Sequence, residues 1–201
     1  LSAKNFIIAT GSTTAEFPVP GLAEVGFLTS DDVLELRETP ESMIVLGAGP
    51  VAVELAQFFC RIGTQTTLVQ RSEYILSKGD EDLAYPVETR FREEGMEVYT
   101  GTKLLRVEKS RYGRTVFFSH DGKEKSATAS TILQALGRKP NIDGLNLSAA
   151  SVNVSQERIE VDQEMRTNVP HIFAVGDVNG LHEIVHIAIE QGEIAAHNAT
   201  Q

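Results

Sequence analysis

Apolar and polar residues in the first third of the chain predict a buried strand, a tight turn and a helix. Residues 43–46 (MIVL) form an apolar run with two β-branched members, which is typical of a buried strand. The apolar residues that follow recur at the spacing of one helical face: Leu55, Phe58, Phe59 and Ile62. The segment 47–50 lies between the two patterns and supplies the turn.

The same alternation continues and predicts a parallel sheet with crossover helices. Gly63 is placed to end the first helix, and residues 65–70 (QTTLVQ) form a second strand. A helix over 80–94 begins with acidic residues, and Gly95 is placed as its C-cap before a strand over 96–99. The apolar line expected on this second helix consists of Leu83, Val87 and Phe91. The pattern is therefore βαβαβ.

Strands without intervening helices follow. Residues 103–109 and 115–119, with a third strand after the Asp121-Gly122 hairpin turn, predict an antiparallel meander. Residues 130–135 form a further buried strand. We therefore expect an α/β fold with a doubly wound parallel sheet and an antiparallel β-meander.

The remaining segments lie toward the two ends of the chain. Strands are expected at 4–10, 158–161 and 171–175. Prolines and glycines predict a loop over 13–28, after which Thr29 or Ser30 caps a short helix that ends at Arg37. A helix over 183–198 closes the chain.

Composition limits the class of protein and of partner. The chain has 201 residues, and 41% of them are apolar, which is enough for a sizeable core. A formal charge of -10 and a pI near 5.0 argue against a nucleic-acid surface, which requires clustered Lys and Arg. The sequence has neither an apolar run of membrane-spanning length nor a signal peptide, so we expect a cytoplasmic protein with no membrane partner. The single cysteine, Cys60, follows Phe59, which favours a buried structural thiol.

The turn after the first buried strand carries candidate chemistry. Gly47-x-Gly49-x-x-Ala52 fits the glycine pattern of dinucleotide-binding folds. Gly47 permits a tight turn, Gly49 lets the backbone approach a pyrophosphate, and Ala52 lets the helix pack closely on the strand. The other residues of this cradle are Ala48, Pro50 and Val51. A purely structural turn is the alternative, but the βαβ context and the N–H groups of the helix start favour phosphate binding.

The end of the second strand bears on the choice of dinucleotide. Folds that prefer NAD place an acidic residue about twenty positions past the glycines, where it holds the ribose 2′-hydroxyl. This chain has Gln70-Arg71-Ser72 there. A guanidinium pairs bidentately with a 2′-phosphate, so Arg71, with Gln70 beside it, favours NADP(H) over NAD(H). Arg71 as ordinary surface charge close to Glu73 is the alternative.

A second motif leaves a function of another class open. Residues 182–186 (HEIVH) match HExxH, which on a helix places two imidazoles on one face for zinc and would indicate a zinc hydrolase. Ile189 and Gly192 occupy positions where one extended form of that motif has Gly and His. The motif also follows Gly176-Asp177 directly. We therefore expect a chance match and no metal site.

Four segments are more specific together than apart: residues 8–12 (IATGS), 47–54 (GAGPVAVE), 135–141 (ALGRKPN) and 167–177 (TNVPHIFAVGD). In this order and spacing they resemble the pyridine nucleotide-disulfide oxidoreductases, the flavoenzyme family of dihydrolipoamide dehydrogenase, glutathione reductase and mercuric reductase. The match spans nearly the whole chain. It implies a Rossmann-like NAD(P)-binding domain at 13–140, inserted between partial flavin-domain segments at 1–12 and 141–201.

The resemblance implies contacts to FAD. Asp177 is placed at a strand end to accept hydrogen bonds from the flavin ribityl hydroxyls, with a helix N-cap as the alternative. Thr10, Gly11 and Ser12 resemble the family's contact to the flavin adenosine. Arg138 is either an ion-pair partner near the flavin or a solvated arginine. The residues expected to line the flavin edge are Glu183, Ile184, Val185 and His186.

Further contacts are implied on the nucleotide side. Glu54 lies near the nicotinamide in the family, although helical geometry alone makes it an ordinary exposed glutamate. Leu104 and Gly137 are carried over as backbone contacts to the dinucleotide.

The activity implied is that of an FAD-dependent oxidoreductase, in which hydride passes from NADPH to FAD and on to a disulfide or another acceptor. A flavoprotein reductase without a redox disulfide, of the ferredoxin- or quinone-reductase type, is the alternative. The family's CxxxxC pair and dimerisation domain have no counterpart in these residues, and the chain starts at Leu1. We therefore expect a fragment of a homodimeric enzyme that holds no catalytic residue of its own and is inactive alone.

Overall fold

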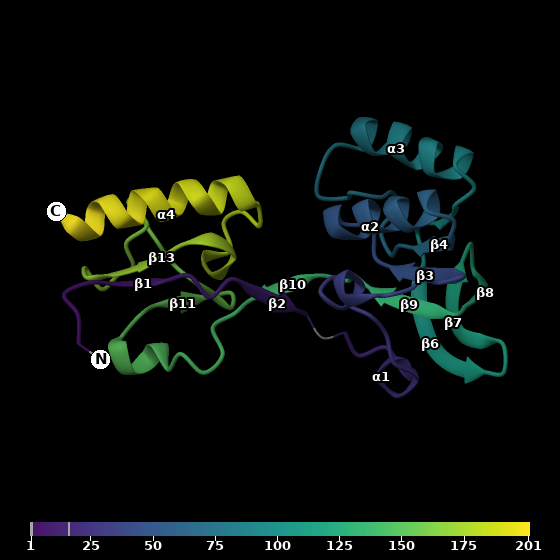
Figure 1. Cartoon of the computed structure of the whole chain (residues 1–201), viewed down its shortest axis with the longest axis horizontal. Coiled ribbons are helices and arrows are strands. Elements are labelled where there is room, and N and C mark those ends of the chain that lie inside the picture. The colour runs from purple at the N-terminus through teal and green to yellow at the C-terminus, as the bar shows by residue number, and fades with distance from the viewer. Residues whose placement is uncertain (1, 16) are drawn as a thin grey trace. The chain divides into compact units, whose positions relative to one another are not determined.

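The computed structural model describes residues 2–15 and 17–201 (Figure 1). Two residues that the predicted segments include, Leu1 and Glu16, lie outside the described residues. The chain forms two compact units, of which one is Glu16–Gly137 and the other combines Leu1–Ala15 with Arg138–Gln201. The first is called the inserted unit and the second the outer unit. The assignment of a nucleotide domain to 13–140 and of flavin segments to its flanks stays a prediction.

The inserted unit contains a four-stranded parallel sheet and a three-stranded antiparallel meander. The sheet has the order β5-β4-β3-β9, built from β3 (Ser42–Leu46), β4 (Gln65–Val69), β5 (Glu97–Tyr99) and β9 (Thr131–Gln134). Its crossover helices are α2 (Pro50–Arg61) and α3 (Glu81–Glu93). The meander consists of β6 (Lys103–Ser110), β7 (Gly113–His120) and β8 (Lys123–Ala129). The predicted α/β fold with a parallel sheet and a meander is therefore confirmed.

The parallel sheet is buried on both faces, which explains its continuous apolar strands. In β3, Met43 and Val45 pack among residues of α2 and α3, whereas Ile44 and Leu46 pack against the meander. All four side chains have no exposed area. Figure 1 shows α2 and α3 on one side of the sheet and β6, β7 and β8 on the other. Two covered faces require apolar residues at successive positions rather than at alternate ones.

The buried faces of both crossover helices differ from the predicted ones. The buried residues of α2 are Ala52, Val53, Ala56 and Phe59. Phe58 and Ile62 are instead 54% and 46% exposed, and on α3 Leu83 is 69% exposed while Ala84 and Phe91 are buried. The predicted apolar lines were therefore wrong at Phe58, Ile62 and Leu83. Alanines, which allow close approach to the sheet, share the buried side with Phe59 and Phe91, so the size of an apolar residue does not by itself mark that side.

Both crossover helices end at the predicted glycines. After α2, the Gly63 N–H donates to the Cys60 carbonyl at 3.1 Å, and the Thr64 N–H donates to the Phe59 carbonyl at 3.0 Å. The same pair of bonds closes α3, where Gly95 takes the place of Gly63. This pattern is the Schellman motif, which satisfies the last carbonyls of a helix. It turns the chain directly into the next strand.

The Cys60 thiol is half-buried and lies near the end of α3. Its Sγ donates a weak hydrogen bond to the Glu94 carbonyl at 3.5 Å. Burial, and after it the charge of Glu94, raises the pKa of the Cys60 thiol. A raised pKa lowers the thiolate fraction, in agreement with a structural thiol.

The outer unit consists of short paired strands and one long helix. Its strands are β1 (Phe6–Ile8), β2 (Ser12–Thr14), β10 (Arg138–Pro140), β11 (Val154–Ser155), β12 (Arg158–Ile159) and β13 (Ile172–Ala174). β1 pairs with β13 in parallel, while β2 pairs with β10 and β11 with β12 in antiparallel fashion. Two 3-10 helices, η2 (Leu147–Ala150) and η3 (Gly176–Asn179), precede α4 (Val185–Thr200). Within the described residues, none of the helices combines the length and apolar character that a bilayer crossing requires.

Two segments depart from the sequence prediction. The predicted loop over 13–28 contains the end of β2 and a short helix, α1 (Leu22–Val25). The helix expected to reach Arg37 is a single 3-10 turn, η1 (Asp32–Glu35). Thr29 and Asp32 close this turn reciprocally, since the Asp32 carboxylate accepts the Thr29 N–H at 2.8 Å and Thr29 Oγ1 accepts the Asp32 N–H at 3.3 Å. Leu36 is extended, so the helix cannot continue.

Glu94 links the ends of α2 and α3. Its Oε1 accepts hydrogen bonds from Arg61 Nη2 at 2.7 Å and from Arg90 Nε at 2.8 Å. Its Oε2 accepts a third from Gln57 Nε2 at 3.1 Å. These bonds, the one from Arg61 foremost, lower the pKa of Glu94 from 4.5 to about 2 because they favour the ionised carboxylate.

We expect Glu94→Gln to lower the thermal unfolding midpoint at pH 7. The folded-state pKa of about 2 lies below the unfolded value of 4.5, so the stabilisation is complete above pH 4.5 and is lost as the pH falls through 2. Thermal unfolding of both proteins, followed by circular dichroism from pH 7 to pH 2, measures this difference. Glu93→Gln is the control, because Glu93 is 59% exposed and meets Arg90 at 3.3 Å. Equal midpoints for Glu94→Gln and the parent at pH 7 would contradict the prediction.

Candidate functional site

The turn between β3 and α2 has a backbone geometry that requires glycine at its first position. Gly47 has φ +102°, and a Cβ at this position would lie 2.4 Å from the carbonyl oxygen of Ala135. The Gly47 N–H donates to the Val69 carbonyl at 2.9 Å. The Ala135 N–H donates to the Leu46 carbonyl, also at 2.9 Å. The turn is therefore fixed between the ends of β4 and β9.

The start of α2 presents an open surface with donors. Gly49 is exposed, has φ −74°, and a Cβ built there would meet no atom of the described residues within 4 Å beyond its chain neighbours. Pro50 occupies the first helical position, and the first turn holds no acidic side chain. The N–H groups of Val51 and Ala52 have no acceptor within the helix. Together with the positive end of the helix dipole, they make this surface suitable for an anion.

The other residues predicted on the nucleotide side also follow the carboxyl ends of the parallel strands. Gln70 and Arg71 follow β4, Leu104 lies in β6 shortly after β5, and Gly137 follows β9. Leu46 of β3 is in register with Val69 and Gln134, so three of these strand ends are neighbours at one edge. Ligands of parallel α/β sheets bind outside this edge.

Arg71 and Glu73, the charged residues after β4, do not pair with each other. Arg71 is exposed and takes part in none of the ion pairs among residues 2–15 and 17–201. The Glu73 carboxylate lies against Gly101, where a Cβ would come within 2.9 Å of Oε2. The Gln70 carbonyl accepts the Thr102 N–H at 3.0 Å and the Thr102 hydroxyl at 2.8 Å. The backbone beside Arg71 is thus fixed, while its guanidinium remains accessible.

The other residues predicted to contact the nucleotide differ in burial and in hydrogen bonding. Ala48 is 1% exposed, and its carbonyl accepts the Leu76 N–H at 2.8 Å. Glu54 is exposed on α2, one turn after the cradle. Leu104 faces Phe118 across the meander, beside a β-bulge. The backbone contacts of Leu104 and Gly137 to the dinucleotide stay predictions.

Asp177, Ser12 and Arg138 form a chain of hydrogen bonds in the outer unit. The Ser12 hydroxyl donates to Asp177 Oδ2 at 2.6 Å and accepts from Arg138 Nε at 2.7 Å. Arg138 Nη2 also donates to the Ser12 carbonyl at 2.9 Å. The guanidinium polarises the hydroxyl that binds the carboxylate, which strengthens both bonds. Arg138 is therefore half-buried and bonded rather than solvated.

The alternative interpretation of Asp177 as a helix N-cap is wrong. Asp177 lies within η3, whose N-cap is Val175, and the N-cap of α4 is Ile184. Its side chain is only partly buried, so the carboxylate is held by Ser12 and remains accessible.

Thr10 and Gly11 are joined to Asn141, which lies close to Arg138 in the sequence. Thr10 Oγ1 donates to the Asn141 carbonyl at 2.7 Å, and Asn141 Nδ2 donates to the Thr10 carbonyl at 3.2 Å. The Asn141 N–H donates to the Gly11 carbonyl at 2.9 Å. Two of the four diagnostic segments are therefore connected by side-chain and backbone bonds.

The HExxH segment does not adopt the geometry of a zinc motif. His182 and Glu183 precede α4, and Ile184 is extended with φ −137° and ψ 126°. The two histidines thus do not share a helical face, and the zinc-hydrolase alternative loses its structural basis. Nowhere in the described part of the chain do three His, Cys, Asp or Glu residues gather in a way that could hold a metal ion. The residues predicted at the flavin edge, Glu183, Ile184, Val185 and His186, are all exposed.

Sequence reasoning missed two buried amides behind Asp177. Asn179 is 1% exposed and Gln191 is 5% exposed. The sequence did contain a pattern that indicates burial of Gln191. Ala188, Gln191 and Ala195 recur at helical spacing on the side of α4 that faces the core. A glutamine on such a stripe must find a partner when it is buried.

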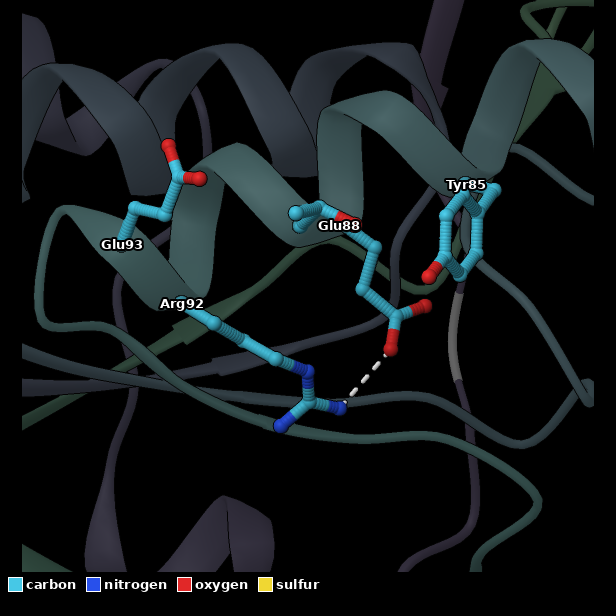
Figure 2. A pocket seen from close by; sticks show the side chains of 5 residues that line it. Tyr85, Glu88, Arg92 and Glu93 are labelled. Atoms are coloured by element: carbon cyan, nitrogen blue, oxygen red, sulfur yellow. Dashed lines mark hydrogen bonds and ion pairs between the residues drawn. The ribbon is translucent and has the colours of Figure 1, made fainter.

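Two hollows of the inserted unit lie away from the predicted residues. The first, of about 360 Å³, is lined from one helix face by Tyr85, Glu88, Thr89, Arg92 and Glu93. Figure 2 shows these side chains on α3, with Arg92 paired to Glu88 at 2.7 Å. The second, of about 520 Å³, includes Ser42, Gln65 and Glu97 at the amino ends of β3, β4 and β5. The glycine turn lies at the opposite ends of these strands.

Comparison with protein families matches residues 1–192 to the model described as pyridine nucleotide-disulphide oxidoreductase. The chain belongs to this family. The predicted resemblance is therefore confirmed at the level of the family, and the specific roles of single residues stay predictions.

Relatives of this oxidoreductase chain include enzymes with different names. It is 35% identical to a mercuric reductase of Staphylococcus aureus, over 99% of the chain and 37% of that protein. It is 36% identical to a dihydrolipoyl dehydrogenase of Bacillus subtilis, over 98% of the chain and 43% of that protein. The chain also resembles a solved structure of the HOCl-induced flavoprotein disulfide reductase RclA from Escherichia coli, with a TM-score of 0.84 and 26% sequence identity. The match covers 94% of this chain and 43% of that structure's chain. The chain spans about two fifths of the curated relatives it matches.

We expect Gly47→Ala to lower the free energy of unfolding by about 2–4 kcal/mol, because the added Cβ meets a carbonyl oxygen and the backbone is strained. Urea unfolding of the parent and the variant measures this loss. Gly49→Ala is the matched control, since its φ of −74° is ordinary and the space around it is open. It should stay within about 1 kcal/mol of the parent. Equal losses for the two variants would contradict the explanation.

Proposed function

We propose that the chain is the NAD(P)H-binding part of a flavin-dependent oxidoreductase, and that NADP(H) is the preferred nucleotide. The observation that carries the proposal is the glycine turn at residues 47–52, which opens α2 at the carboxyl edge of a parallel sheet. When bound, NADPH supplies a hydride that FAD accepts and passes to a disulfide or another acceptor. Membership of the family supports the use of both a pyridine nucleotide and FAD.

The start of α2 is suited to hold the pyrophosphate. The N–H groups of Val51 and Ala52 would donate to phosphate oxygens, and the open space at Gly49 would let these oxygens approach the backbone. The absence of an acidic side chain from this first turn avoids repulsion of the phosphates. Glu54 would lie toward the nicotinamide end of the nucleotide.

Arg71 is the residue that we propose for the 2′-phosphate of NADPH. Its guanidinium is exposed, and the Glu73 carboxylate is turned toward Gly101 rather than toward Arg71. An accessible guanidinium pairs with a phosphate through two parallel hydrogen bonds.

Residues of the outer unit would hold FAD. We propose that Asp177 accepts hydrogen bonds from the ribityl hydroxyls, because its carboxylate is held by Ser12 at 2.6 Å yet is only partly buried. The backbone from Thr10 to Ser12, which Asn141 fixes, would face the adenosine. The segment from Glu183 to His186, which leads into α4, would line the flavin edge. These roles support binding and orientation, which are the contributions that a protein makes to flavin chemistry.

The electron acceptor is a separate question from the donor. The named relatives include a mercuric reductase and a dihydrolipoyl dehydrogenase, whose names indicate different acceptors. The proposal therefore concerns hydride entry from NADPH, which is the part of the reaction that the inserted unit would serve. We expect the full-length enzyme to be a homodimer.

Gly49→Ala tests the nucleotide site directly. We expect it to raise the dissociation constant for NADPH by about tenfold or more, since a methyl group would occupy the space that the pyrophosphate approaches. Titration calorimetry with NADPH measures the change. Gly192→Ala is the control, because Gly192 lies in α4 and also has open space around its Cα. A folded Gly49→Ala protein with the parental affinity would sink the proposal.

Arg71→Gln tests the preference between the two nucleotides. We expect the dissociation constant for NADPH to rise by about tenfold to a hundredfold, the usual range for loss of a charge-assisted hydrogen bond, while that for NADH stays unchanged. Arg111→Gln removes another exposed charge, from the turn between β6 and β7, and serves as the control. An unchanged ratio of the two affinities, or faster hydride transfer from NADH than from NADPH in the parent enzyme, would overturn the preference.

A further inference from the structure

A buried pair of amides holds the turn that carries Asp177. Gln191 Oε1 accepts the Gly176 N–H at 2.7 Å and Asn179 Nδ2 at 2.8 Å. Asn179 Nδ2 also donates to the Ala174 carbonyl at 3.3 Å, and its Oδ1 accepts the Leu181 N–H at 3.0 Å. One oxygen atom of α4 is therefore bonded to both ends of η3.

These hydrogen bonds are buried, and α4 packs closely on the turn that they hold. Asn179 and Gln191 are 1% and 5% exposed, so a donor that lost its acceptor would find no water to replace it. Gly176 has φ +73°, and a Cβ there would lie 3.4 Å from the Ala188 Cβ, so α4 packs directly on the turn. The observed turn therefore gives Gln191 Oε1 and both polar atoms of the Asn179 amide hydrogen-bond partners directly beneath α4.

Asp177 lies between the two bonded positions and is held on its other side by Ser12 at 2.6 Å. From this geometry we infer that Gln191 is a positioning residue, which sets the place of the Asp177 carboxylate for the ribityl hydroxyls without touching the cofactor. The inference rests on the proposed role of Asp177 in binding FAD. Val185 and His186, which are proposed for the flavin edge, begin the same helix, so Gln191 joins this helix directly to the turn that carries Asp177.

The test measures the dissociation constant for FAD in the flavoenzyme that contains this chain, after removal of the flavin and reconstitution. Gln191→Met keeps the length of the side chain and removes the oxygen acceptor, so we expect the constant to rise about tenfold or more. Gln191→Glu keeps an acceptor for both donors and should restore affinity to within about threefold of the parent. A purely structural role would not predict this recovery.

A stability control separates positioning from general destabilisation. Val152→Ala removes two methyl groups from the apolar cluster that also contains Val178 of η3, where Val152 is 6% exposed, and it leaves the amide hydrogen bonds of the turn in place. It should lower the unfolding midpoint and leave FAD affinity unchanged. Parental affinity in Gln191→Met, or an equal loss in Gln191→Met and Val152→Ala, overturns the inference. If Gln191→Met does not fold, Asn179→Ser replaces it, since it removes one donor to Gln191, and parental FAD affinity in that variant overturns the inference as well.

Asp177→Ala distinguishes failure of this inference from failure of the proposed function. If Asp177→Ala weakens FAD binding and Gln191→Met does not, only the positioning role is wrong. If Asp177→Ala has the parental affinity for FAD, the proposed flavin role of the turn is wrong, and the inference falls with it. Weakened binding in both, with recovery in Gln191→Glu, supports the two together.

Discussion

The approach of the Gly47 backbone to the Ala135 carbonyl is the constraint on which the proposed nucleotide-binding surface depends. A side chain at this position would lie 2.4 Å from that oxygen, so only glycine lets the chain turn there. The turn starts α2 directly beyond the carboxyl end of β3, beside the ends of β4 and β9. The donors of the helix start, the open space at Gly49 and the accessible Arg71 then belong to one edge of one sheet. Close packing of two backbones thus produces a surface that is suited to an anion although it has few charged side chains.

The outer unit fixes its strand-to-glycine junction in a different way. Beyond β13, the turn at Gly176 is held by side chains, because Gln191 and Asn179 bind its backbone and Ser12 binds Asp177. A turn held by backbone packing tolerates most side-chain changes nearby. A turn held by a buried amide depends on that one residue, since a lost partner leaves donors unsatisfied. The two proposed cofactor sites are therefore expected to respond differently to substitution.

Much of the fold could be predicted from local patterns. The order of strands and helices in the inserted unit, the glycines that end α2 and α3, and the family followed from short segments of the sequence. The predicted apolar lines were wrong at Phe58 and Leu83, because alanines take up part of the side that faces the sheet and leave some of the larger apolar residues exposed. The HExxH pattern was expected to be a chance match, and the structure gives the reason: α4 begins at Val185, so the first histidine of the motif lies outside the helix.

The sequence by itself predicted the strand, turn and helix of the glycine cradle, because these follow from local patterns of residues. The close approach of Gly47 to the Ala135 carbonyl, which makes glycine necessary there, was decided by the tertiary structure. The sequence also determined the exposed charge at Arg71, which stands where the end of a strand is predicted. Only the tertiary structure decided the bonds from Arg138 to Ser12 and from Ser12 to Asp177, which join residues 126 and 165 positions apart. It likewise decided that Gln191 faces Gly176 and Asn179. Hydrogen-bond partners so distant along the chain leave no periodic pattern, because folding alone brings them together.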